Sequence, residues 1–380
     1  MTYLRLTPRD PVVARDGRPF GRGSGRRMKS LEWLLPSVAA GAARTMLGKT
    51  DARGFSLAVV KELKEMAVAG PLAWYGGKLY FAAPKDFVLQ AKPRQCFRVR
   101  PRKPVDGDYC DLPGEKPGDE KLWPVLLPES VTEDFKPEAA PAWWSEGKMT
   151  AWLMEGDFAT PPKKDERTAA DGFLEALERD ERTHAAIEAE RGAAAEHMLY
   201  GTVSLAFPEG LAISLRVADA MGKLAGLHPV GGERRLVEWR KDEAANWQCD
   251  PELARKLGKA ERIRMVLATP ALFGGGWRPG WLDGNLEGTP PGTGVTLRLV
   301  GAAVERWRAV SGFGLEEGLR GPKPVRRMAP AGSVYFFEYV KGERATLAGD
   351  GWLAAVSDLA EDGQDRRDGF GLALWGIWSE

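Results

Sequence analysis

The fold is decided near the start of the chain, in YLRLTPRDPVVARDGRPFGRGSGRRMKSLEWLLPSVAAGAARTMLG, residues 3–48. Residues 3–7 alternate, with both leucines on one face, which is the period of a half-buried strand. Two prolines end this strand, because proline cannot donate to a ladder. A helix follows a long loop, with Ser37 as the predicted N-cap and Gly48 as the C-terminal cap.

The loop between strand and helix alternates glycines with basic residues, which are Arg15, Arg18, Arg22, Arg26, Arg27 and Lys29. Glycine lets the backbone approach a ligand closely, and arginine supplies forked donors that match phosphate oxygens. Asp16, beside Gly17, can anchor an arginine or accept from a base edge or a ribose hydroxyl. The pattern predicts binding of nucleic acid or phosphate, or else a solvated, positively charged surface.

Five segments, in order along the chain, resemble the RAMP superfamily. They are RDGRPFG with LPSVAAGAARTMLG, HPVGGERR (228–235), LATPALFGGGWRPGW (267–281), GPKPVRRMAPAGSVYFFE (321–338) and GFGLALWGIW (369–378). Within that superfamily they are similar to the third subunit of the Cmr, or type III-B, CRISPR effector complexes. Ordered matches between the two termini are more specific than a single glycine-rich loop. Residues 104–164 carry no matching motif.

The resemblance implies a non-catalytic RNA-binding subunit that holds the 5′ tag of the guide RNA (crRNA). It also implies docking to the large polymerase-type subunit and to the RAMP backbone subunit. The predicted RNA-binding residues are Arg15, Asp16, Gly17, Arg18, Arg26, Lys29, Arg44, His228, Gly231, Gly232, Arg234, Arg235, Trp277, Lys323, Arg326, Arg327, Gly369, Phe370 and Gly371. Neither a cofactor nor a metal ion is predicted.

Glycine-rich loops outside the first stretch also indicate RNA binding. Residues 274–277 and 369–371 admit close backbone approach, with stacking from Trp277 or Phe370. The similar segment 312–314 is interpreted as a turn beside a core aromatic residue. Unpaired ribonucleotides suit such loops, because arginine and aromatic planes hold the bases while amides and cations bind the phosphates.

Composition limits where nucleic acid can bind. The 380 residues carry a net charge of only +1, so any electrostatic footprint is local. Basic residues gather in 5–29 and 92–103, and acidic residues in 165–196. Segment 92–103 suits either an RNA strand or a charged surface strand, and the surface strand is the preferred interpretation.

The three cysteines, Cys96, Cys110 and Cys249, fit neither a disulfide framework nor a zinc site, which indicates reduced thiols in the cytoplasm. The chain starts directly with a strand rather than a signal peptide. Because no apolar run approaches the roughly 20 residues of a membrane span, no membrane partner is predicted.

The remaining pattern is typical of an α+β fold, since short strands alternate with a few helices. The resemblance sharpens this to two ferredoxin-like (RRM-like) domains, which periodicity alone does not predict. The domains are expected at 1–103 and 181–380, with a Pro/Trp-rich insertion and linker helix at 104–180. The tryptophans of the insertion predict ordered structure, because so much apolar area favours burial.

Several element boundaries are predicted as well. Helices are expected at 55–67, 169–179, 218–227 and 352–359, and hairpins around Gly76-Gly77 and between 199–207 and 211–217. Further strands are expected at 236–240, 262–269, 295–304, 325–328, 334–340 and 370–378. Residues 183–188 have helical composition, but the resemblance indicates a strand.

Two alternatives remain open, and a nucleotide site is rejected. His228 beside Arg234 and Arg235 could supply the base and cation of a metal-independent endoribonuclease that processes CRISPR repeat RNA, although a structural or RNA-contacting histidine is preferred. A protein-only scaffold would instead direct its basic loops to acidic subunits. Residues 43–50 nearly match a P-loop, but they end a helical run, so no nucleotide site is predicted.

Overall fold

The computed structural model describes residues 1–15, 26–51, 55–104, 122–188, 190–218, 224–314 and 321–379. The chain divides into two compact units, each built from three separate segments. Unit 1 contains Met1–Gly76, Ala176–Glu243 and Ala309–Arg327, and unit 2 contains Gly77–Glu175, Ala244–Arg308 and Met328–Glu380. This discontinuous division differs from the consecutive domains expected from the sequence.

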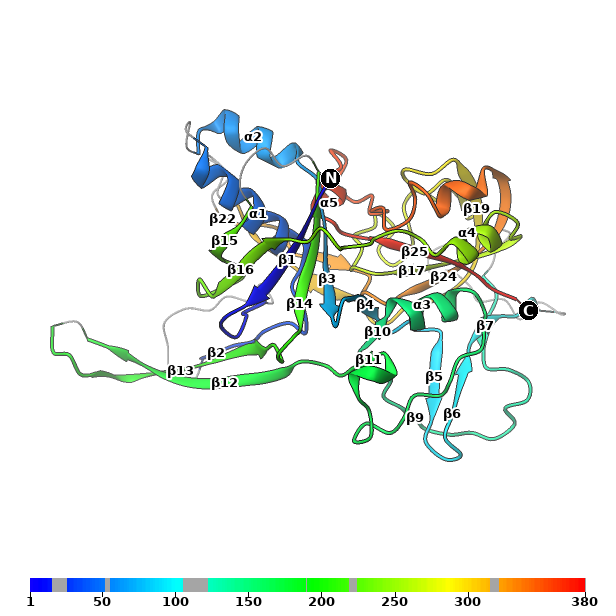
Figure 1. Cartoon of the computed structure of the whole chain (residues 1–380), viewed down its shortest axis with the longest axis horizontal. Coiled ribbons are helices and arrows are strands. Elements are labelled where there is room, and N and C mark those ends of the chain that lie inside the picture. Colours follow the sequence, from blue (N-terminus) through cyan, green and yellow to red (C-terminus); the bar gives the residue numbers. More distant parts are fainter. Residues whose placement is uncertain are drawn as a thin grey trace. The chain divides into compact units, whose positions relative to one another are not determined.

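The main sheet of unit 1 is antiparallel, with the strand order β3-β14-β1-β16-β15 (Figure 1). Its strands are β1 (Thr2–Pro8), β3 (Val68–Tyr75), β14 (Ala212–Val217), β15 (Gly226–Pro229) and β16 (Leu236–Lys241). The alternation that predicted β1 is confirmed, because Leu4 and Leu6 are both fully buried. These leucines lie on the face of the sheet that forms the core.

Two helices complete this core: α1 (Pro36–Thr50) and α2 (Leu57–Glu65). Small residues of α1 pack with Leu4, Leu6 and the buried side chains of β14 in one cluster; they are Ala39, Ala40 and Ala43. Their short side chains let the helix lie close to the sheet. Ser56 caps α2 by accepting a hydrogen bond from Val59 N at 3.4 Å.

A second sheet of unit 1 contains a long two-stranded ribbon, which extends away from the main sheet (Figure 1). The ribbon consists of β12 (Glu178–Ile187) and β13 (Ala194–Ala206), which are antiparallel. The short strand β2 (Arg26–Met28) pairs with β13 in parallel. The strand expected at 183–188 is confirmed as part of β12.

Unit 2 is built around a sheet with the order β18-β19-β24-β17-β25. Its strands are β17 (Arg262–Leu267), β18 (Glu287–Gly288), β19 (Val295–Ala303), β24 (Val334–Gly342) and β25 (Ala373–Ile377). Smaller ladders are β4 (Lys78–Ala82), β10 (Trp143–Ser145) and β11 (Phe173–Leu174); β5 (Phe87–Gln90), β6 (Gln95–Arg98) and β9 (Pro137–Glu138); and β7 (Arg100–Pro101) with β8 (Val125–Leu126).

The remaining elements are short. The helices of unit 2 are α3 (Glu146–Leu153), α4 (Pro251–Leu257) and α5 (Gln364–Arg367), with 3-10 turns at Ala169–Asp171 and Arg344–Leu347. Strand pairs β20 (Arg308–Val310) with β23 (Arg326–Met328), and β21 (Phe313–Gly314) with β22 (Gly321–Pro322), complete the list. The result is a sheet-rich α+β fold with few helices, as the sequence predicted.

The described part of the Pro/Trp-rich insertion is ordered. Trp144 and Trp152 are almost fully buried, and Trp144 stacks on Phe158 at a ring-centroid distance of 4.7 Å. Phe87 meets Trp144 edge-on at 4.9 Å. The prediction that the tryptophans bury themselves in an irregular but ordered segment is therefore confirmed for these residues.

The predicted ends of α1 are wrong. Leu35 is the N-cap and Pro36 occupies the first turn, which suits proline because its missing N–H has no partner there. Gly48 lies inside the helix, and Asp51 is the C-terminal cap. A Cβ at Gly48 would lie 2.4 Å from the Phe55 ring, so this glycine makes room for an aromatic side chain.

Two predicted helices are absent from the described chain. At 169–179 a capping box between Thr168 and Asp171 closes a single 3-10 turn, and Gly172 ends it with φ of 78°. At 352–359 Leu353 has φ of 51°, and its N–H donates to Ala373 O at 2.8 Å. Bonding to a distant strand replaces the helical pattern there.

The predicted hairpin between 199–207 and 211–217 is also wrong, although both strands exist. β13 pairs with β12 and β2, whereas β14 pairs with β1 and β3, so the chain changes sheets at the intervening turn. Of the helix expected at 218–227, residues 219–223 lie outside the described residues, and Gly226–Pro229 forms β15.

Candidate nucleic-acid interface

Two predicted RNA-binding segments of unit 1 meet although they are more than 200 residues apart in sequence. Val13 and Gly232 form a β-bridge, and Gly232 N donates to Val13 O at 2.8 Å. A Cβ at Gly231 would lie 2.4 Å from Val13 O, and one at Gly232 would lie 3.5 Å from Arg15 Cγ. Glycine is required at position 231 for this approach, which brings Arg15 beside the turn.

The two ends of the basic loop are tied together at the same place. Arg15 forms a β-bridge with Ser30, and the Ser30 hydroxyl accepts a hydrogen bond from Ala14 N at 3.1 Å. Leu31 N donates to Ala14 O at 2.6 Å. Arg15 and Lys29 are both exposed on either side of this closure. The predicted residues Asp16, Gly17 and Arg18 lie outside the described residues.

The turn between β15 and β16 has an unusual backbone. Gly231, Glu233 and Arg234 have φ of 77°, 58° and 48°. Val230 N donates to Arg235 O at 3.1 Å and closes the turn. Positive φ is unfavourable for side chains larger than glycine, so Glu233 and Arg234 store strain, which is a feature of functional sites. Both side chains are exposed.

The two arginines of this turn, and Lys29 at the end of the basic loop, lack an ion-pair partner among the described residues, although Glu233 is in the same turn. Lys29, Arg234 and Arg235 form no ion pair with the described part of the chain, and Arg235 Nε is buried without a hydrogen-bond partner there. By contrast, Arg27 pairs with Glu181, and Arg240 of β16 pairs with Glu238. The uncompensated positive charge of unit 1 thus includes the turn that meets Arg15.

His228, on the strand that leads into this turn, is only 6% exposed. Burial lowers its pKa, and the nearby Lys49 ammonium lowers it further. Its carbonyl accepts a hydrogen bond from Trp239 Nε1 at 3.3 Å, and its ring meets Trp239 edge-on. A ring so covered offers no base to a 2′-hydroxyl, so the geometry favours the structural interpretation over the ribonuclease.

Other predicted cations of unit 1 have individual environments. Arg26 lies on β2, level with Tyr200 of the ribbon. Arg44 donates to Met66 O at 2.8 Å, which joins α1 to the end of α2. Lys323 is exposed, and its backbone N–H bonds to Gly312 O at 2.8 Å. Arg326 and Arg327 lie on the adjoining strand β23.

The glycine-rich loops predicted at 274–277 and 369–371 belong to unit 2. Gly371 N donates to Pro270 O at 2.8 Å, and Thr269 Oγ1 donates to Gly369 O at 2.7 Å. Trp277 is half-buried, whereas Phe370 is fully buried. Stacking of a base on Phe370 is therefore not available, and this part of the prediction is corrected: its ring anchors the loop in the core.

The basic segment 92–103 is occupied with structural contacts. Arg94 donates to the carbonyls of Pro161 and Pro162 and pairs with Glu138. Arg98 donates to Gly156 O at 2.9 Å and lies 4.1 Å from the Trp152 ring. These arginines fasten β6 to the insertion, in agreement with the preference for a non-RNA role.

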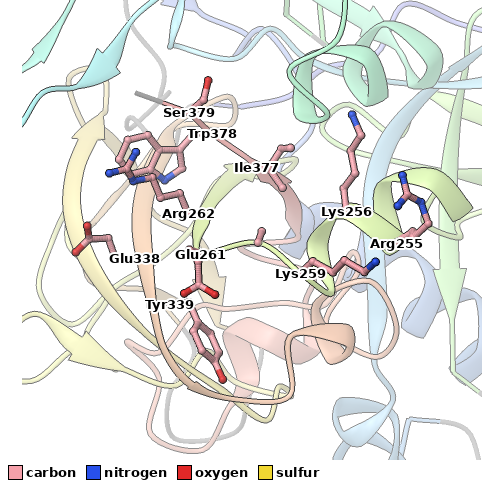
Figure 2. A pocket seen from close by; sticks show the side chains of 11 residues that line it. Arg255, Lys256, Lys259, Glu261, Arg262, Glu338, Tyr339, Ile377, Trp378 and Ser379 are labelled. Carbon is pink, nitrogen blue, oxygen red and sulfur yellow. The ribbon is translucent and has the colours of Figure 1, made fainter.

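Unit 2 also has a pocket of about 760 Å³, which the sequence did not single out (Figure 2). Its lysines and arginines come from α4, the turn after it and the start of β17. Arg262 lies 5.0 Å from the Trp378 ring. Glu261 and Glu338 on its wall pair with Arg344 and Arg298. Arg255 pairs with Glu252, so this pocket combines paired carboxylates and a paired arginine with further cations.

Clusters of metal-ligating side chains and long apolar helices are both absent from the described ranges. Within them, no group of three or more His, Cys, Asp or Glu side chains could hold a metal ion. No helix of the described chain has the length and apolar character needed to cross a bilayer.

Two residues that hold the loops in place, Ser30 and Asp358, were not predicted from the sequence, because a lone serine or aspartate carries no motif.

Comparison with known proteins identifies the family. Residues 4–378 match the model described as CRISPR-associated protein (Cas_Cmr3). No curated protein sequence matches the chain. A chain of the cryo-EM structure of the type III-B Cmr-beta bound to cognate target RNA is 16% identical, with a TM-score of 0.49 and coverage of 88% of this chain and 86% of that one.

Two more solved structures are similar to lower degrees. A chain of the same Cmr-beta with target RNA and AMPPnP, state 1, is 14% identical, with a TM-score of 0.48 and coverage of 88% and 86%. A chain of the Csm3–Csm4 subcomplex from the type III-A CRISPR-Cas interference complex is 10% identical, with a TM-score of 0.38 and coverage of 90% and 94%. The family model matches nearly the whole sequence, and the chain belongs to the Cas_Cmr3 family of CRISPR-associated proteins, as its ordered motifs predicted.

Proposed function

We propose that this chain is a non-catalytic RNA-binding subunit of a type III-B CRISPR ribonucleoprotein, in which it holds the 5′ tag of the crRNA. The observation that carries the proposal is the group of cations around the turn 230–235. Lys29, Arg234 and Arg235 have no ion-pair partner in the described chain, and Gly231 and Gly232 bring the turn against Arg15. Phosphates supply the missing negative charge.

Single-stranded RNA suits this surface better than a duplex. The cations stand on a short turn and on the ends of a loop, rather than along a helix or a flat face. Unpaired nucleotides can bend around such a projection, with arginine planes against bases and ammonium groups against phosphates. The strained backbone of Glu233 and Arg234 is consistent with a turn that is kept for contact rather than stability.

The wider proposal follows from family membership. The chain docks the large polymerase-type subunit and the RAMP backbone subunit, within the cytoplasm, in antiviral defence. The free cysteines Cys96 and Cys249 agree with a reducing compartment. We assign each unit to a ferredoxin-like domain with insertions. Unit 1 supports this with two helices packed on one face of an antiparallel sheet.

The test replaces the free cations in the assembled complex. Arg234→Ala with Arg235→Ala should lower the crRNA content of the purified complex and the yield of RNA crosslinks to residues 228–235. Arg240→Ala is the matched control, because Arg240 is an exposed arginine on the adjoining strand but pairs with Glu238. RNA content and crosslinks equal in both variants, with the complex intact, would refute the proposal.

A further inference from the structure

One carboxylate of unit 2 holds both ends of the glycine-rich loop 273–281. Asp358 Oδ1 accepts a hydrogen bond from Gly274 N at 2.7 Å. Asp358 Oδ2 accepts from Gly280 N at 2.6 Å and from Trp281 N at 3.1 Å. A Cβ at Gly280 would lie 2.7 Å from the carboxylate, so the loop approaches Asp358 only because position 280 is glycine.

The middle of the loop is fixed separately. Gly275 and Arg278 form a β-bridge, and the Tyr335 hydroxyl donates to Trp277 O at 2.6 Å. Tyr335 itself is fully buried. Gly274 and Gly275 are nevertheless exposed, and Trp277 is half-buried. The loop therefore presents bare backbone and one indole at the surface, in a conformation set from below.

The residue before Asp358 holds the second glycine-rich loop. Ser357 Oγ accepts a hydrogen bond from Leu272 N at 3.0 Å. A Cβ at Gly371 would lie 2.7 Å from the same oxygen, and Val356 N donates to Gly371 O at 2.9 Å. Residues 356–358 thus link the loop at 273–281 to the loop at 369–371.

Partial burial of Asp358 disfavours the ionised form of its carboxylate. Burial raises its pKa, whereas the three backbone donors and the Arg366 guanidinium act in the opposite direction. Arg366 also donates to Ser357 O at 3.1 Å. A partly buried carboxylate with all of its bonds directed to one loop's backbone fixes that loop's geometry, and its own oxygens are already used.

We propose that Asp358 is a positioning residue for RNA contact, which fixes the loop at 273–281 so that its bare backbone and Trp277 meet an unpaired ribonucleotide. The inference rests on the proposed RNA-binding function. Asp358 does not touch the RNA, because its charge repels phosphate and its oxygens accept from the loop. It acts through the loop alone.

Asp358→Asn is the sharpest variant. The amide replaces one acceptor oxygen with a donor, which then faces a backbone N–H of the loop. In the assembled complex, we expect crosslinks between crRNA and peptide 270–281 to fall at least about fivefold, while crosslinks to 228–235 stay within about twofold. Trp277→Ala should give the same local loss. A role confined to stability would instead lower both crosslinks together with the melting temperature.

A second variant keeps the carboxylate. Gly280→Ala places a Cβ against Asp358 and displaces the loop without changing charge, so it should reproduce the local loss if Asp358→Asn does not fold. Loop crosslinks that persist in Asp358→Asn or Gly280→Ala but vanish in Trp277→Ala would overturn the inference. Wild-type crosslinks at 228–235 without any at 270–281 would overturn it too, leaving RNA binding intact. Absence of both would overturn the proposed function itself.

Discussion

Gly231→Ala should separate the turn at 230–235 from Arg15. A Cβ at this position would lie 2.4 Å from Val13 O, about 1 Å shorter than an ordinary contact. The backbone must move, and the hydrogen bond from Gly232 N to Val13 O would lengthen or break. The turn would then no longer be held against residues 13–15.

The magnitude follows from three contributions. An alanine at φ of 77° costs about 1 kcal/mol. Loss of one backbone hydrogen bond costs about 1 kcal/mol. Relief of the contact with Val13 adds roughly 1 kcal/mol or more, as for an overpacked site. We therefore expect local opening of this turn to become easier by about 3 kcal/mol.

Gly192→Ala is the matched control, because Gly192 has φ of 63° but open space around its would-be Cβ. It should cost only the backbone term of about 1 kcal/mol. Hydrogen exchange of the peptide that contains the Gly232 amide measures the opening, and anisotropy with a labelled crRNA tag measures affinity. Equal effects of the two substitutions on exchange would refute the close approach as the cause.

Three further outcomes are expected. Gly48→Ala should be neutral or raise the melting temperature, because alanine favours a helix by about 1 kcal/mol and the exposed Phe55 ring can swing aside; a clear loss measured by calorimetry would contradict this. Arg264→Met should lower the free energy of unfolding by about 3–5 kcal/mol in urea titrations, because it leaves the buried Asp86 carboxylate unpaired; a loss below about 1 kcal/mol would count against it. His228 has a lowered pKa in the folded chain, so the unfolded chain binds the proton at a higher pH, and the free energy of unfolding falls as pH drops below about 6.5. His228→Gln should flatten that part of a profile of melting temperature against pH, and an unchanged slope would contradict this expectation.

Strands were largely predictable from the sequence, whereas their partners were not. β1, β16, β17 and β24 were located to within a few residues. Alternation identified β1, which buries one face, whereas β17 is buried along almost its whole length. β13 and β14 were found too, but their separation into two sheets depends on partners far away in the chain. The helix expected at 169–179 failed because Gly172 takes a left-handed conformation.

The candidate site shows the same limit. Residue type and motif order singled out Arg15 and the turn 228–235, and the family match agrees with the motifs. Which arginines remain free could not be predicted. Arg94 and Arg98 bind carbonyls about sixty residues further along the chain, so their charge is used internally. Phe370 has the composition of a stacking residue, but the surrounding core covers it.

The segments of the two units alternate along the chain, which affects both synthesis of the protein and the design of truncated variants. Unit 1 acquires its last segment, Ala309–Arg327, only when most of the 380 residues have left the ribosome. Its early strands therefore remain in an incomplete unit during synthesis. An incomplete unit exposes apolar surface, which favours aggregation. For the same reason, no single truncation point yields either unit whole, and new linkers between its three segments would be needed to study one unit without the other.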